Sequence, residues 1–258
     1  MELLKRMQAE GHRQVALFSD PGSGLRSIIA IHDTSLGPAL GGTRMWNYAS
    51  EDDALTDVLR LSKAMTYKAS LAGLNLGGGK GIIIGDPHKD KSEALFRAYG
   101  RAVDSMAGQY ITAEDVGTTP QDLEIVMRET KWLVGKPPSA GGSGDSAPAT
   151  GFGLFQGMRA LAKEAFGNPS LAGKTVAIQG FGKVASNLAR YLRSEGARLV
   201  VADIYPQATN SARTEFGAEI VPPETIYEVP CDVFSPCALG GTLNENTIPL
   251  LKCRVIAG

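Results

Sequence analysis

The spacing of apolar residues in the first half of the chain predicts strands that alternate with helices. Apolar positions with helical periodicity follow Ser50, which forms a capping-box-like start with Asp53. Thr119 and Pro120 have the residue types of a helix N-cap and first turn. The pattern predicts strands over residues 14–19, 25–32, 81–85 and 109–112, with the first two joined by a turn over 20–24, and helices over residues 50–67 and 90–106.

The second half of the chain follows a break at residues 135–149, which are rich in Gly, Pro and Ser. We expect this break to be the crossing between two domains, residues 1–138 and 139–258. After it, the pattern predicts helices over 150–166, 183–194 and 207–216, and strands over 175–179, 198–202, near Val233 and near Val255. Such alternation with short connections indicates a parallel sheet wound in the right-handed sense. The fold class is therefore α/β.

Composition excludes several classes of function. Of the 258 residues, 43% are hydrophobic and 21% charged, as in an ordinary soluble globular protein, and the net charge is −1. This charge gives no electrostatic reason to expect a nucleic acid or an anionic membrane as a partner. No apolar run approaches the ~18 residues of a membrane span, and the N-terminal segment lacks the apolar core of a signal peptide.

The cysteines and histidines do not form a recognisable metal site or disulfide framework. Cys231, Cys237 and Cys253 contain no Cys-x-x-Cys pair, and their odd number argues against a framework of disulfides. We therefore expect a reducing, cytoplasmic location. His12, His32 and His88 have no neighbours with metal-ligand spacing, so each is expected to be a surface or turn residue.

Two lysines flank an apolar, glycine-rich segment. The segment between Lys68 and Lys80 contains almost no other charge, and desolvation there would disfavour the charged form of a lysine. A lysine held partly neutral can act as a base, and a charged lysine nearby could hold a carboxylate. The segment is not a phosphate-binding loop, because Leu74 replaces the first glycine of that motif and Gly81 its hydroxyl residue. The pair therefore indicates chemistry on an amino or keto acid.

A second motif lies between a predicted strand and a predicted helix. Gly180-Phe-Gly182-Lys-Val-Ala185 has the form G-x-G-x-x-A, and Asp203 follows the next strand at close to the expected spacing of about 20 residues. Gly182 would let the backbone approach a pyrophosphate at the helix N-terminus, and Asp203 would bind the ribose 2′-hydroxyl of NAD. The alternative is a plain βαβ turn in which Asp203 caps the next helix.

An acidic pair marks the end of another predicted strand. Strand ends of α/β sheets face clefts, so Asp115 could contact a substrate and pass protons. Glu114 would point the other way if the strand alternation continues, and we expect it to be structural.

Several long motifs resemble the glutamate/leucine/phenylalanine/valine dehydrogenases. They are Gly37-Pro-Ala-Leu-Gly-Gly-Thr-Arg-Met-Trp46, Met65-Thr-Tyr-Lys68, Gly73-Leu-Asn-Leu-Gly-Gly-Gly-Lys80, Ile111-Thr-Ala-Glu-Asp-Val-Gly-Thr-Thr119 and Cys237-Ala-Leu-Gly240. The resemblance runs along essentially the whole chain and is strongest to the members that act on leucine. It implies a substrate domain, a Rossmann NAD-binding domain and an active-site cleft between them.

The resemblance also implies a reaction and its residues. NAD would accept a hydride from the substrate α-carbon, and the imine would be hydrolysed reversibly to a 2-oxo acid and ammonia. Lys68 would hold the α-carboxylate, Lys80 would be the base that activates water, and Asp115 would relay protons. The alternative for Lys68 is a helix C-terminal lysine that interacts with the helix dipole.

Substrate and cofactor contacts follow from the same resemblance. Glutamate-specific members carry a lysine where this chain has Leu40, so an apolar, branched aliphatic side chain is favoured here, although valine and phenylalanine remain alternatives. Backbone at Gly41, Gly42 and residues 77–79 would approach the ligand, unless these glycines simply form turns. The implied substrate contacts are Leu40, Gly41, Gly42, Met65 and Ala113, and the implied cofactor contacts are Thr150, Gly180, Gly182, Lys183, Val184, Ala185, Asp203, Cys237 and Ala238. For Ala113 and Thr150 the alternatives are a small strand residue and a helix cap.

Family members continue for roughly a hundred residues beyond the position that matches Gly258. The resemblance implies a homo-oligomer, an octamer in many members. Two hypotheses follow: an active NAD-dependent dehydrogenase, or a non-catalytic NAD-binding fragment.

Overall fold

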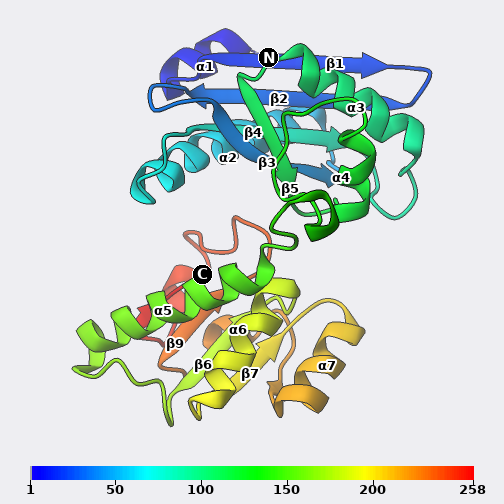
Figure 1. Ribbon diagram of the computed structural model, residues 1–258. Helices are drawn as coiled ribbons and strands as arrows, with labels where there is room; N and C mark the ends of the chain where they lie inside the picture. The colour runs from blue at the N-terminus through cyan, green and yellow to red at the C-terminus, as the bar shows by residue number, and fades with distance from the viewer. Residues whose placement is uncertain (1) are drawn as a thin grey trace. The chain divides into compact units, whose positions relative to one another are not determined.

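The computed structural model describes residues 2–258 (Figure 1). The chain divides into two compact units, Met1–Asp145 and Ser146–Gly258. The division lies inside the Gly-, Pro- and Ser-rich segment, a few residues after the boundary expected between residues 138 and 139. Along the described residues, no helix is both long and apolar enough to cross a membrane.

The first unit contains a mixed sheet with the strand order β1-β2-β4-β3-β5. Strand β3 runs parallel to β4 and β5, whereas β2 is antiparallel to β1 and β4. The strands are β1 (Gln14–Asp20), β2 (Leu25–Asp33), β3 (Ala39–Trp46), β4 (Gly77–Ile84) and β5 (Tyr110–Glu114), and the helices are α1 (Leu3–Glu10), α2 (Glu51–Leu71), α3 (Glu93–Ser105) and α4 (Pro120–Val126).

Helices cover both faces of this sheet. Buried residues of α2 pack with Ile28, Ala30 and Ile82 on one face, while residues of α3 and α4 pack with Ile29, Ile31 and Ile83 on the other. The predicted starts of α2 and α4 are confirmed, because Asp53 N donates to Ser50 Oγ at 3.1 Å and Thr119 forms a capping box with Asp122. Helix α3 begins three residues after its predicted start at residue 90, because Ser92 is its N-cap. The face that α2 covers is called the α2 face below.

The glycine-rich segment of the first unit is a strand, not a turn. Strand β4 begins at Gly77, four residues before the predicted strand. A Cβ at Gly78 would lie 2.1 Å from Thr66 Oγ1 of α2, and one at Gly79 would lie 2.8 Å from the ring of Tyr110. These glycines therefore let α2 and the tyrosine pack against the strand. Apolar side chains do not alternate with polar ones along this segment, so the sequence pattern did not predict the start of β4. The pattern did not predict β3 either.

The prediction that all three histidines lie at the surface or in turns is wrong for two of them. His12 and His32 are 8% and 9% exposed, and their rings form a T-shaped pair with centroids 4.9 Å apart. His12 Nε2 bonds to the Leu59 carbonyl at 3.0 Å, and His32 Nδ1 bonds to the Thr66 hydroxyl at 2.8 Å. His88 is an exposed turn residue, as predicted.

The second unit contains a parallel sheet with the strand order β10-β9-β6-β7-β8. Its elements are α5 (Ala147–Phe166), β6 (Thr175–Gln179), α6 (Lys183–Ser194), β7 (Arg198–Ala202), α7 (Pro206–Phe216), β8 (Glu219–Ile220), β9 (Val233–Pro236) and β10 (Val255–Ile256). Short 3-10 turns lie at Ile226–Glu228 and Ile248–Leu250 in this unit, and a third lies at Pro138–Ala140 in the first unit. The predicted bounds of β6, α6 and β7 are confirmed. The α/β class is thus confirmed in both units.

Candidate active site

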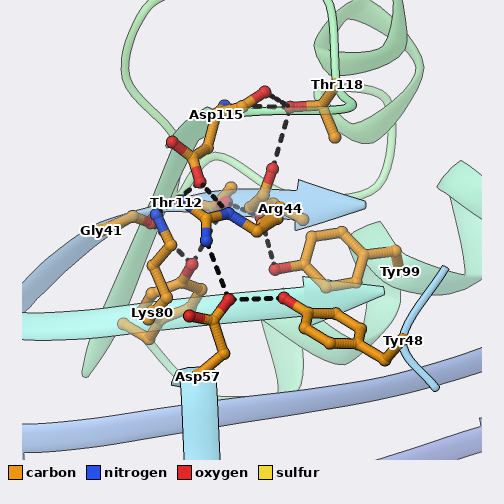
Figure 2. A network of polar contacts seen from close by, with 11 residues as sticks. Gly41, Arg44, Tyr48, Asp57, Lys80, Tyr99, Thr112, Asp115 and Thr118 are labelled. Carbon is orange, nitrogen blue, oxygen red and sulfur yellow. Dashed lines mark hydrogen bonds and ion pairs between the residues drawn. The ribbon is translucent and has the colours of Figure 1, made fainter. Parts of the chain in front are cut away.

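Lys80 lies on strand β4 inside the first unit and is 5% exposed. It pairs with Ala30 of β2, whose side chain packs on the α2 face, so the Lys80 side chain points to that face as well. Its Nζ atom donates to Asp115 Oδ2 at 2.7 Å (Figure 2). Burial lowers the pKa of Lys80, and the Asp115 carboxylate opposes this shift. The direction agrees with the expectation for a base.

Asp115 is held in a tight turn directly after β5. Its backbone N–H donates to Thr118 Oγ1 at 3.0 Å, and the Thr118 hydroxyl donates to the Thr43 carbonyl of β3 at 2.9 Å. Gly117 adopts a φ of 81°, and a Cβ there would lie 1.9 Å from the Met45 carbonyl oxygen. Burial alone would raise the pKa of Asp115, but the positive charges of Lys80 and Arg44 outweigh burial and lower it. The carboxylate is therefore fixed and ionised.

Arg44 is a member of this site that the sequence reasoning missed. Its Nε donates to Asp115 Oδ2 at 3.1 Å, and its Nη1 donates to Asp57 Oδ2 at 2.8 Å. The Tyr48 hydroxyl donates to the same Asp57 oxygen at 2.6 Å (Figure 2). Because the Asp115 partner lies 71 residues away, chain spacing gave no indication of the contact. The available clue was that Arg44 and Leu40 share one face of an alternating strand.

Buried hydroxyl groups brace the opposite face of the sheet. The Thr43 hydroxyl bonds to Tyr99 at 2.6 Å and to Thr112 at 2.5 Å, and the Tyr110 hydroxyl donates to the Gly41 carbonyl at 2.6 Å. These contacts fix the backbone of β3, the strand that carries Arg44. The strand that positions Arg44 on the α2 face is therefore held by buried hydrogen bonds on its other face.

The predicted substrate residues fall into two groups. Leu40 pairs with Gly78, and Gly42 pairs with Ala113, so these side-chain positions share the α2 face with Lys80. A Cβ at Gly41 would lie 1.6 Å from the Gly79 carbonyl oxygen, and one at Gly42 would lie 2.5 Å from that of Glu114. The two glycines thus allow the neighbouring strand and the end of β5 to approach β3 closely. The sequence predicted only that they would contact a ligand.

The other predicted substrate residues lie on α2. Met65 is half-buried, and Lys68 is exposed in the last turn of the helix. Their neighbour Thr66 packs against Gly78 of β4. The C-terminal part of α2 is therefore next to the strand that carries Lys80.

The glycine motif in the second unit joins β6 to α6. Gly180 adopts a φ of 84°, and a Cβ there would lie 2.7 Å from the Ala238 backbone nitrogen. Gly182 is the N-cap of α6, and a Cβ there would meet no atom within 4 Å. Ala185 is buried at 1% exposure, so α6 packs closely onto the sheet. The arrangement leaves space for an anion at the helix N-terminus.

Asp203 follows β7 and lies beside the glycine motif. Its Oδ2 accepts from Phe181 N at 2.6 Å, and its Oδ1 accepts from Tyr205 N at 2.8 Å. The N-cap of α7 is Tyr205, so the alternative in which Asp203 caps that helix is wrong. The Cys237 N–H donates to the Gln179 carbonyl at 2.7 Å, which brings Cys237 and Ala238 to the same end of the sheet.

The remaining predicted cofactor residues occupy helix starts. Lys183 and Val184 open α6. Thr150 lies within α5, where its hydroxyl donates to the Ser146 carbonyl at 2.9 Å, so the alternative that made it a helix cap is wrong. The Cys237 thiol bonds to Ser235 Oγ at 3.3 Å, and burial raises its pKa. Among the residues that the structure describes, no cluster of His, Cys, Asp and Glu could hold a metal ion.

The second unit has a parallel sheet with a glycine motif at a helix N-terminus, and the first unit has a buried Lys–Asp pair; the first feature is typical of the α/β dinucleotide-binding class. Two family models match: "Glu/Leu/Phe/Val dehydrogenase, dimerisation domain" at residues 12–132, and "Glutamate/Leucine/Phenylalanine/Valine dehydrogenase" at residues 141–206. The chain belongs to the glutamate/leucine/phenylalanine/valine dehydrogenase family, whose members are amino-acid dehydrogenases.

Three relatives illustrate the match. The chain is 58% identical to a leucine dehydrogenase of Geobacillus stearothermophilus over 100% of this chain and 70% of that protein. It is 47% identical to a valine dehydrogenase of Streptomyces virginiae over 96% of this chain and 70% of that protein. The structure is similar to the crystal structure of L-tryptophan dehydrogenase from Nostoc punctiforme, with a TM-score of 0.71, 42% identity, and coverage of 99% of this chain and 72% of that one.

Proposed function

We propose that the protein is an NAD-dependent L-amino-acid dehydrogenase that deaminates L-leucine and other branched-chain amino acids to 2-oxo acids and ammonia, reversibly. The observation that carries this proposal is the buried Lys80, whose pKa is lowered by desolvation and whose Nζ lies 2.7 Å from Asp115. A neutral lysine amine can take a proton at the working pH. The site therefore supplies the base that hydrolysis of an imine requires.

Each site residue has a role in this reaction. Lys68 binds the substrate α-carboxylate through its charge, and the α-amino group lies toward Lys80. NAD, when bound, supplies the acceptor for the α-hydride. Lys80 then removes a proton from the water that attacks the imine carbon, and Asp115 accepts and returns protons during collapse to the 2-oxo acid and ammonia. Both lysines are on elements of the first unit, α2 and β4.

The preference for a branched aliphatic side chain is supported by Leu40. This residue lies on the α2 face, on a strand directly beside the strand of Lys80. An apolar residue there offers no partner for a γ-carboxylate, which would be buried unpaired. The high identity to leucine dehydrogenases, compared with 47% to valine dehydrogenases, favours leucine as the main substrate.

The choice of NAD is supported by the glycine motif and Asp203. The open space at Gly182 suits a pyrophosphate, and the first turn of α6, with Lys183 and Val184, would contact it. The carboxylate of Asp203 would accept from a ribose 2′-hydroxyl and repel the 2′-phosphate of NADP. Thr150, Cys237 and Ala238 complete the proposed cofactor contacts. We also propose a homo-oligomer, because the first family match is described as a dimerisation domain.

The test is the absorbance of NADH formed by the purified protein with L-leucine and NAD at alkaline pH. L-Valine, L-phenylalanine and L-glutamate are compared by kcat/KM, D-leucine is the negative control, and NADP replaces NAD in a parallel series. We expect the highest kcat/KM with L-leucine and NAD. Binding of NAD without NADH formation from any of the L-amino acids would instead favour the non-catalytic NAD-binding protein.

A further inference from the structure

One carboxylate oxygen in the first unit accepts from two cations. Asp115 Oδ2 lies 2.7 Å from Lys80 Nζ and 3.1 Å from Arg44 Nε. The side chain of Arg44 is 14% exposed, and its Nη1 lies 2.8 Å from Asp57 Oδ2. One lysine, Lys80, and one arginine, Arg44, thus face the carboxylates of Asp115 and Asp57, and a different nitrogen of the Arg44 guanidinium contacts each carboxylate.

Asp57 is itself fixed on α2. The Tyr48 hydroxyl donates to the same Asp57 oxygen that Arg44 contacts, at 2.6 Å. Burial and the hydrogen bond to Asp57 raise the pKa of Tyr48, so its hydroxyl keeps the proton that it donates. The guanidinium therefore has one orientation, with Tyr48 and Asp57 behind it and Asp115 in front.

We propose that Arg44 is a positioning residue for the Lys80–Asp115 pair, held in place by Asp57 and Tyr48, and that it keeps Asp115 from capturing Lys80 as a permanent ion pair. This inference rests on the proposed function, in which Lys80 acts as a neutral base. Arginine suits the task because it stays charged at any working pH and its planar fork can bind two carboxylates in fixed directions.

The charges of the network explain the effect. Three charged groups act on Lys80: the anions Asp115 and Asp57 and the cation Arg44. The neutral Tyr48 contacts Asp57. Asp115 favours a protonated Lys80, whereas Arg44 repels the proton and shares the Asp115 oxygen. Without the Arg44 charge, Lys80 would face an excess of negative charge. It would then hold its proton more strongly and would be a weaker base at a given pH.

The test compares Arg44→Gln, which removes the charge, with Arg44→Lys, which keeps it but loses the fork, and Tyr48→Phe, which leaves all charges unchanged. The readout is the acidic limb of the pH profile of kcat/KM with L-leucine. We expect the limb of Arg44→Gln to move to higher pH by about one unit, the scale of the effect of a nearby like charge, which this variant removes. For Arg44→Lys and Tyr48→Phe we expect a lower kcat with the limb within a few tenths of a unit of wild type.

A second measurement separates failure of this inference from failure of the proposed function. The titration of Lys80 is followed by NMR in protein labelled at the lysine side chains, and its signal is assigned by its loss in Lys80→Ala. This readout needs no turnover. A higher Lys80 midpoint in Arg44→Gln than in wild type supports the inference even if L-leucine is not the substrate. An unchanged midpoint in folded Arg44→Gln overturns it. If that variant does not fold, a wild-type kcat in Arg44→Lys does the same, because this variant keeps the charge but loses the planar fork.

Discussion

The two candidate sites of this dehydrogenase are built from different parts of the polypeptide. In the first unit, side chains from β3, α2, β4 and the end of β5 form a chain of contacts through Arg44, Asp57, Lys80 and Asp115. In the second unit, the site is mostly backbone: one glycine motif, a helix N-terminus and one carboxylate. A site of paired side chains has its charges fixed before substrate arrives, while a site of backbone amides takes its shape from glycine conformations. Substitutions should therefore change chemistry in the first unit and cofactor affinity in the second.

The strongest test of this division is Lys80→Ala. Loss of a general base typically costs a factor of 10² to 10⁴, so we expect kcat to fall by at least about 100-fold. The Kd of NAD should stay unchanged, because the glycine motif lies in the other unit. Asp115 keeps Arg44 as a partner, so the variant should still fold. Steady-state kinetics and a fluorescence titration with NAD measure the two effects.

Lys89→Ala is the matched control, since the side chain of Lys89 is 79% exposed and lies on a turn. It should leave both quantities unchanged. A Lys80→Ala variant with a kcat within tenfold of wild type would contradict the role of Lys80 as the base.

Two glycines of the second unit give a contrast within one motif. Gly180→Ala places a side chain at a φ of 84° and 2.7 Å from Ala238 N, so we expect a loss of about 1–3 kcal/mol in the free energy of unfolding. Gly182→Ala meets open space at a φ of −85° and should keep its stability. Its Cβ would instead occupy the approach to the pyrophosphate and weaken NAD binding by about tenfold or more.

Denaturant unfolding of both variants measures the loss of stability, and titration with NAD measures the loss of cofactor affinity. Wild-type NAD affinity in Gly182→Ala would remove this glycine from the cofactor site. Equal stability of the two variants would show that the Gly180 conformation carries no strain for alanine.

Leu40→Lys tests whether specificity belongs to the side chains of the first unit. The charged lysine would replace an apolar contact, and a change of this size in a pocket is worth about 1–3 kcal/mol, or 10- to 200-fold in kcat/KM for L-leucine. Activity with L-glutamate should rise, because its γ-carboxylate gains a partner. Leu40→Met, which conserves volume, is the control. An unchanged ratio between the two substrates would place the pocket elsewhere.

The same contrast explains how far sequence could predict the structure. The bounds of β6, α6 and β7 followed from local residues, because the glycine motif fixes the turn between them. In the first unit, glycines without a periodic pattern hid the start of β4, and β3 was not predicted. Lys80 and Asp115 could be singled out as candidates because desolvation and strand ends are visible in the sequence. Arg44, Asp57 and Tyr48 could not, because their contacts exist only after distant elements have packed.

The smallest expected effect concerns the buried histidine His12 of the first unit, where burial disfavours a positive charge on the ring. Burial lowers the pKa of His12 from the ordinary value of 6.5, while the unfolded chain keeps the ordinary value. As the pH falls below about 6.5, the unfolded state therefore binds more protons than the folded state, and the free energy of unfolding decreases. The facing groups that modify this are His32, Glu10 and Lys63, and the Leu59 carbonyl bond favours the protonated ring.

His12→Gln keeps a donor for the Leu59 carbonyl but does not titrate, so its stability should fall less than that of wild type between pH 7 and pH 5. His88→Gln makes the same substitution at an exposed turn residue and should follow wild type. Urea unfolding at several pH values measures the three proteins. If wild type and His12→Gln lost stability in parallel, the source of the acid sensitivity would not be His12, and Asp115, whose pKa is lowered by Lys80 and Arg44, would be the next group to test.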